Sequence, residues 1–106
     1  MELKLYGYLA EVNKYNRMLF YFTEDSSKDK LSRHCAGDHQ PFNDEYFTVK
    51  LSKKVIGVPA DIIGLVGLNC VCTVKLQHYK FISKMQANVG EVVRGVNLVL
   101  LDIARG

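Results

Sequence analysis

Apolar and polar residues alternate along several stretches of this chain. In three of them the residues between the apolar ones include lysine and tyrosine: Lys4, Tyr6 and Tyr8; Tyr46, Thr48 and Lys50; Lys75, Gln77 and Tyr79. Because residues i and i+2 of a strand share one face, each stretch predicts a strand with one apolar face and one basic, aromatic face. The plainer interpretation is a sheet with one face in water, where lysine is common and tyrosine favours strands for packing reasons.

The pattern and its interruptions predict five strands and one short helix. The strands are expected at residues 3–12, 17–23, 45–52, 68–81 and 96–104. Residues 58–67 are expected to be helical, since Pro59 suits the first turn and Gly67 suits the end. Two connections, 24–44 and 82–95, are expected as long loops. The first is expected to be mobile without a ligand, because it lacks apolar anchors between Phe22 and Phe42.

The length of 106 residues suits one domain with one core, spanning residues 1–106. The net charge of +3 is unevenly distributed. Residues 24–46 hold six acidic and three basic residues, whereas the rest of the chain holds eleven basic and five acidic ones. A basic body with one acidic segment suits phosphate binding, although a basic surface also serves solubility.

The cysteine content and the hydropathy of the chain indicate the cellular compartment. No apolar run approaches the roughly 20 residues that cross a bilayer, and no signal peptide precedes the first alternating stretch. Three cysteines, an odd number, argue against a disulfide framework, and Cys70 and Cys72 are expected to be buried on one face of a strand. These features predict a reducing, intracellular compartment: the cytoplasm, or the nucleus for a eukaryotic or viral protein, without a membrane partner.

Five strands with a helix between the third and the fourth resemble the OB-fold, an all-β, five-stranded Greek-key barrel. Gly7 would lie near the middle of a coiled first strand, and a helix at 59–66 would plug the bottom of the barrel. Within that superfamily the chain is similar to small single-stranded-DNA-binding proteins, over nearly its whole length, in the order of its elements rather than in a motif. Ten alternating apolar residues are expected inside the barrel: Leu3, Leu5, Leu9, Phe22, Phe47, Val49, Val74, Leu76, Leu98 and Leu100.

In OB-folds the ligand lies over the second and third strands, between the first-to-second and fourth-to-fifth connections. With the alternating pattern, the resemblance implies a nucleic-acid site of aromatic and basic residues: Tyr6, Tyr8, Arg17, Phe20, Tyr21, Tyr46, Lys50, Lys75, Tyr79, Lys80, Lys84 and Arg94. Rings would stack on bases and cations would neutralise phosphates. Phe20 is open between this face and the core, because either Leu19 or Phe20 faces outward.

The nearest approach to a metal-binding pattern is His34, Cys35 and His39, with Asp38 nearby. Their spacing is not that of a zinc finger, and a Cys-x-x-Cys partner is absent from the sequence. No metal or other cofactor is therefore expected. The sequence also lacks Gly-x-Ser-x-Gly, Gly-x-Gly-x-x-Gly, His-Glu-x-x-His and a phosphate loop, so the chain is expected not to be an enzyme.

The sequence thus favours a protein that binds single-stranded nucleic acid with little sequence preference, DNA rather than RNA, in replication, recombination or repair. Two alternatives remain. One is a protein-interaction module, either an assembly subunit or an inhibitor, that makes contact through the acidic segment 24–45. The other is an RNA-binding OB domain. A homo-oligomer is compatible with each of these alternatives.

Overall fold

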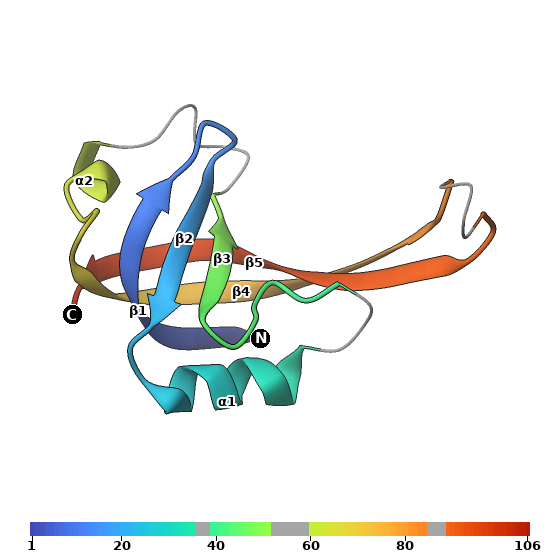
Figure 1. The fold of residues 1–106 in the computed structure, drawn as a ribbon, viewed down its shortest axis with the longest axis horizontal. Helices are drawn as coiled ribbons and strands as arrows, with labels where there is room; N and C mark the ends of the chain where they lie inside the picture. The colour runs from blue at the N-terminus through green and yellow to red at the C-terminus, as the bar shows by residue number, and fades with distance from the viewer. Residues whose placement is uncertain (36–38, 52–59, 85–88) are drawn as a thin grey trace.

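The computed structural model describes residues 1–35, 39–51, 60–84 and 89–106. Within these residues the elements are β1 (Glu2–Val12), β2 (Arg17–Phe22), α1 (Asp25–His34), β3 (Tyr46–Lys50), α2 (Ala60–Ile63), β4 (Asn69–Ile82) and β5 (Val92–Arg105). The strands form a closed barrel in the order β1-β2-β3-β5-β4, with β4 returning to β1. All neighbouring pairs are antiparallel except β3 and β5. The predicted all-β, OB-like barrel of five strands, with a short helix between β3 and β4, is confirmed (Figure 1).

The tight connection between β1 and β2 explains why these two strands pair. The Asn13 side chain accepts hydrogen bonds from the backbone amides of Tyr15 and Arg17, at 2.9 and 3.1 Å. Asn16 adopts a left-handed φ of 60°, which asparagine tolerates better than most residues. The turn therefore closes at residues 13–16, between the strands expected at 3–12 and 17–23.

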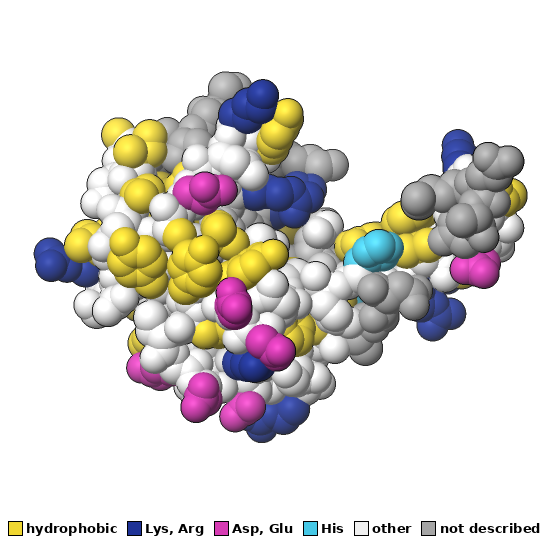
Figure 2. Space-filling model, viewed as in Figure 1, with side chains coloured by type: hydrophobic (Ala, Val, Ile, Leu, Met, Phe, Trp, Pro, Cys, Tyr) yellow, Lys and Arg dark blue, Asp and Glu magenta, His cyan; other side chains and the backbone are white. Residues whose placement is uncertain are grey.

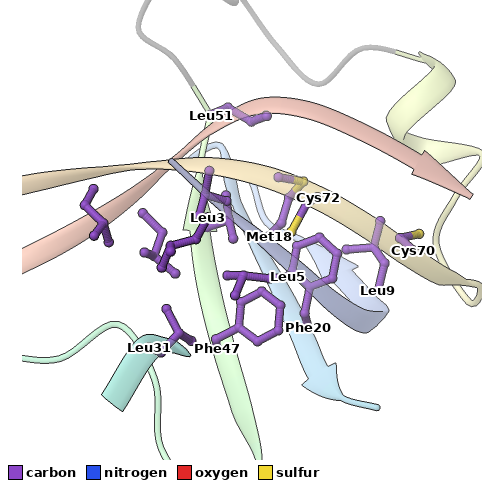
Figure 3. Packing of buried hydrophobic residues seen from close by; sticks show 14 of the residues in the cluster. Leu3, Leu5, Leu9, Met18, Phe20, Leu31, Phe47, Leu51, Cys70 and Cys72 are labelled. Atoms are coloured by element: carbon purple, nitrogen blue, oxygen red, sulfur yellow. The ribbon is translucent and has the colours of Figure 1, made fainter. Parts of the chain in front are cut away.

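The core follows the predicted alternation and contains further residues. The ten predicted residues are buried or pack against the buried cluster, Phe22 and Leu100 being only partly buried. Phe20 is also fully buried and stacks on Phe47, with ring centroids 5.0 Å apart (Figure 3). A Cβ atom on Gly7 would lie 3.0 Å from Phe20 Cβ and from the Phe47 ring, so the absence of a side chain lets β1 cross directly over the two rings.

The segment 24–44 is not the unstructured loop that the sequence predicted. It contains α1, because Ser27, Leu31 and Cys35 recur every four residues and form one buried stripe. In Figure 3, Leu31 reaches from α1 towards Phe47. The expectation that this segment lacks apolar anchors is therefore wrong.

Helix α1 lies under the barrel and covers a free edge of β1 (Figure 1). Residues 2–6 of β1 pair with β4 but lie beyond the end of β2. Ser27 Oγ accepts a hydrogen bond from the Tyr6 amide at 2.9 Å, and Lys30 Nζ donates to the Lys4 carbonyl at 3.1 Å. Helix α2 contributes Ile62 to the same core. Ser52, Val58 and Pro59, on which parts of the predicted third strand and helix fall, lie outside the described residues.

A short segment, residues 39–43, fills the gap between β3 and β5. On one side the Thr48 amide donates to the Pro41 carbonyl at 2.8 Å, and the Asn43 amide donates to the Tyr46 carbonyl at 2.9 Å. On the other side the His39 amide donates to the Arg94 carbonyl at 3.1 Å. This segment completes the barrel wall where, among the residues that the structure describes, β3 and β5 pair directly at Lys50 and Val99.

Beyond the barrel, β4 and β5 continue as a two-stranded ribbon, which we call the arm (residues 77–84 and 89–95; Figure 1). The sequence predicted a loop at 82–95, which is wrong, because β5 already begins at Val92 and pairs with Ile82. Past Lys75, β4 no longer pairs with β1. Among the described residues, no helix is long and apolar enough to cross a membrane.

Candidate nucleic-acid interface

Three tyrosines from three neighbouring strands form one row on the outer face of the barrel. Tyr8 of β1 lies directly opposite Tyr21 of β2, and Tyr21 lies opposite Tyr46 of β3. Their exposed fractions are 39%, 43% and 36%, so all three rings reach solvent. The rings of Tyr21 and Tyr46 meet edge to face, with centroids 6.3 Å apart and planes at 82°. We call Tyr8, Tyr21 and Tyr46 the tyrosine row.

The inward neighbours of the tyrosine row hold it in place. Along β2 and β3 each exposed tyrosine alternates with core phenylalanines: Phe20, Phe22 and Phe47. The backbone that carries the row is therefore fixed by a stacked aromatic core, by ladders on both sides of β1 and β2, and by the β2 ladder and the segment 39–43 beside β3. Side chains on strands packed in this way present a more reproducible surface than side chains on loops. Figure 2 shows hydrophobic side chains gathered over this part of the face, with acidic ones mostly below them towards α1.

Two cations lie opposite each other on the same face, four residues along the strands from the row. Arg17 of β2 is the cross-strand partner of Lys50 of β3. The strand rise places them about 13 Å from Tyr21 and Tyr46. Like charges directly opposite each other destabilise a sheet. Neither cation forms an ion pair within the described residues, where the salt bridge found joins Lys28 to Asp44 at 2.9 Å. An anion above the pair would relieve its repulsion.

A hollow of about 190 Å³ opens beside Arg17, at the base of the arm. It is lined by residues of β2, β3, β4, β5 and the segment 39–43: Arg17, His39, Gln40, Pro41, Thr48, Tyr79, Val96, Asn97 and Leu98. The hollow brings Tyr79 and Arg17 together although they are far apart in the sequence. His39, Gln40 and Asn97 were not among the predicted site residues. The segment 39–43 brings His39 and Gln40 here, and β5 brings Asn97.

The arm carries a second aromatic pair. Tyr79 and Phe81 lie two residues apart on β4, with nearly parallel rings 6.2 Å apart. The Tyr79 ring covers Gly95, where a Cβ atom would collide with it. Lys80 lies opposite Arg94, and Lys84 is exposed further out. These cations are thus separated from the tyrosine row along the chain and along the sheet.

The remaining predicted residues lie apart from this face. Phe20 is a core residue with no exposed surface, and its alternative assignment to the ligand face is wrong. Tyr6 is half-buried above α1, to which its amide is bonded. Lys75 is exposed on β4, opposite Glu2 of β1. The structure thus brings together Tyr8, Tyr21 and Tyr46 with Arg17 and Lys50, and joins Tyr79 to them at the hollow.

The cysteines and histidines form no comparable site. Among the described residues, no group of three or more His, Cys, Asp or Glu side chains lies close enough to hold a metal ion, and Asp38 lies outside those residues. Burial raises the pKa of Cys35 to about 11 and that of Cys72 to about 12. Both thiols are therefore protonated at neutral pH, which makes them poor nucleophiles and poor metal ligands.

Comparison of the chain with protein-family models, with curated proteins and with solved structures gives no match. The functional argument therefore depends on the geometry of the face and on its chemistry.

Proposed function

We propose that this protein binds single-stranded nucleic acid without sequence preference and without catalysis, DNA in preference to RNA, during replication, recombination or repair. The observation that carries the proposal is the tyrosine row across β1, β2 and β3, with the Arg17–Lys50 pair on the same face. The choice of DNA over RNA, and of these processes, depends on the resemblance to small single-stranded-DNA-binding proteins.

The row suits bases that are separated from one another. Tyr21 and Tyr46 have centroids 6.3 Å apart, whereas bases stacked within a duplex strand repeat every 3.4 Å or so. A base can stack on each ring only if the strand is extended and its own stacking is broken. Each such contact contributes roughly 1–3 kcal/mol and accepts any base, because every base has a π-face.

The paired cations suit the backbone of the same strand. Phosphates beside Arg17 and Lys50 would remove the repulsion between two like charges and release counterions. In the free protein this pairing of like charges lowers stability, as is expected of a site that binds an anionic ligand. Such binding weakens as salt rises.

A protein-interaction module is the second candidate function, and the arm is the observation that favours it. Phe81, Ile82, Val89 and Val92 near its end are 50 to 68% exposed. Exposed apolar side chains gathered on a projecting ribbon are typical of protein contacts. This alternative places the contact on the arm instead of on the segment 24–45.

A titration with oligo-dT at several salt concentrations tests the proposal. Tyr21→Ala should weaken binding by roughly 1–3 kcal/mol and leave the salt dependence unchanged, because a ring is removed and no phosphate contact is lost. Leu101→Ala, on β5 and 50% exposed, removes an apolar side chain outside this face; it is the control and should bind as the wild type does.

Circular dichroism shows whether both variants are folded. If wild type does not bind oligo-dT even at low salt, the nucleic-acid proposal is wrong and the arm becomes the surface to examine. If folded Tyr21→Ala binds as tightly as wild type, the row is not a stacking surface. Competition between DNA and RNA oligomers of one sequence decides the preference for DNA.

A further inference from the structure

The tyrosine row leads to a second hollow, at the end of the barrel opposite the arm. Its volume is about 310 Å³, and it is lined by Tyr8, Gly67, Leu68, Asn69, Arg105 and Gly106. Only Tyr8 was predicted as a site residue from the sequence. Tyr8 belongs both to the row and to the hollow. A nucleic-acid strand lying across the row would therefore continue into the hollow.

Asn69 extends the row by one strand. It is the cross-strand partner of Tyr8 in the β1–β4 ladder, so its side chain and the Tyr8 ring lie on the same face. Asn69 is exposed, and within the described residues its side-chain amide forms no hydrogen bond. Its backbone carbonyl is already used, because it accepts from the Gly106 amide at 2.9 Å. The free amide therefore offers an adjacent donor and acceptor beside an exposed ring.

The backbone of the hollow is fixed. The Gly67 amide donates to the Leu9 carbonyl at 2.8 Å, and the φ angle of Gly67 is 89°. A Cβ atom on Gly67 would lie 3.8 Å from the Tyr8 hydroxyl, so a larger residue would enter the hollow. The glycine thus keeps open the space next to Tyr8 and holds the chain in a conformation that other residues rarely adopt.

We propose, building on the function proposed above, that this hollow binds one nucleotide of the strand that crosses the tyrosine row. Its base lies against the Tyr8 ring and pairs with the amide of Asn69, and its phosphate lies near Arg105. A side-chain amide pairs with base edges that present a donor next to an acceptor, as it does with adenine. The volume of 310 Å³ is at the small end of the range of about 300–1,000 Å³ for ligand pockets, which suits a single nucleotide.

The test compares oligo-dT with an abasic deoxyribose-phosphate oligomer of the same length. Asn69→Ala should weaken oligo-dT binding about tenfold, which corresponds to about 1.4 kcal/mol, and leave binding of the abasic oligomer unchanged. Arg105→Ala should weaken both ligands by a similar factor, because both carry phosphates. Gln77→Ala removes another exposed amide from the same strand, eight residues away, and should match wild type.

The outcomes separate this inference from the function on which it depends. If Asn69→Ala binds oligo-dT as wild type does, or loses both ligands equally, while Tyr21→Ala still weakens oligo-dT, the hollow is not a base subsite and the tyrosine row stands. If Arg105→Ala changes neither ligand, the phosphate assignment is wrong. If the wild type binds neither oligomer, both proposals are overturned. Asn69→Asp keeps the size of the side chain, loses its donor and should weaken oligo-dT further, which checks the result should Asn69→Ala fail to fold.

Discussion

The barrel face and the arm carry the same kinds of side chain, tyrosine and phenylalanine beside lysine and arginine, on very different supports. The tyrosine row lies on three neighbouring strands of a closed barrel, with a stacked phenylalanine core beneath. The stacked rings of Tyr79 and Phe81 lie on a ribbon of two strands whose outer part pairs only with itself. A two-stranded ribbon is marginally stable on its own in water, whereas a closed barrel fixes its outer side chains. The same chemistry is thus preorganised on the face and adaptable on the arm.

The largest expected effect is a difference in stability between substitutions in the barrel core and substitutions on the arm. Phe47→Ala removes a fully buried ring that packs against Phe20 and Phe22, and should lower the free energy of unfolding by about 3–5 kcal/mol. Phe81→Ala removes a half-exposed ring from the arm and should lower it by less than about 1 kcal/mol. Urea unfolding followed by circular dichroism measures both. Equal losses of stability would show that the arm unfolds together with the barrel core. The two regions would then not differ in rigidity.

The next effect is a pH dependence of stability that comes from a thiol buried inside the barrel. Burial raises the pKa of Cys72 from 9.0 to about 12, with a further contribution from the neighbouring Cys70. A thiol with a higher pKa in the folded state stabilises the fold fully below about pH 9, and this contribution is lost as the pH rises towards 12. As the pH rises from about 8 to about 10.5, the contribution of Cys72 to the free energy of unfolding should therefore fall by on the order of 2 kcal/mol.

Cys72→Val is the comparison that isolates this contribution. Valine has a similar volume and does not ionise, so the variant should lose less stability than wild type over the same pH interval. The quantity to measure is the difference between the two proteins, because other groups titrate equally in both. If the two pH profiles run parallel, the Cys72 thiol is not held protonated by burial.

How far the sequence predicts this structure depends on the range of the interactions. The strands and the core follow from a period of two, which is a local signal, and the burial pattern of β1 alternates as expected. Helix α1 was missed because its ten residues are mostly polar, although the four-residue spacing of Ser27, Leu31 and Cys35 was available in the sequence. The arm was missed because glycine ordinarily weakens a strand, whereas at Gly95 the Tyr79 ring of the other strand covers the position.

The candidate site was predicted as residue types and not as an arrangement. The tyrosine row depends on the register of three strands, and a slip of one residue would turn each ring to the other face. The same is true of the pairing of Arg17 with Lys50 and of Tyr8 with Asn69. Phe20 is different, because it lies two residues from Phe22 and the alternation alone places both on the inner face. The register, which sets Phe20 opposite Leu9 and Phe47, agrees with that placement.

The smallest effect is the sharpest test of whether the face or the arm receives phosphate. Lys50→Met removes one member of the like-charged pair and keeps the aliphatic part of the side chain. At low salt the variant should gain about 0.2–1 kcal/mol of stability, because the repulsion with Arg17 is relieved. The salt slope of its oligo-dT affinity should fall by about 0.7, the value for one phosphate contact to a single strand. A gain in stability together with a loss of binding is the signature of a charge placed for a ligand.

Two other lysines make this last comparison decisive. Lys75 lies opposite Glu2, so Lys75→Met should gain no stability and leave the salt slope unchanged. Lys80→Met on the arm should change the slope only if the arm also contacts the strand. If Lys80→Met lowers the slope and Lys50→Met does not, the phosphates follow the arm, and the like charges of Arg17 and Lys50 have no role in binding. If Lys50→Met alone lowers it, the preorganised face carries the backbone of the ligand, and the arm is left for a different partner.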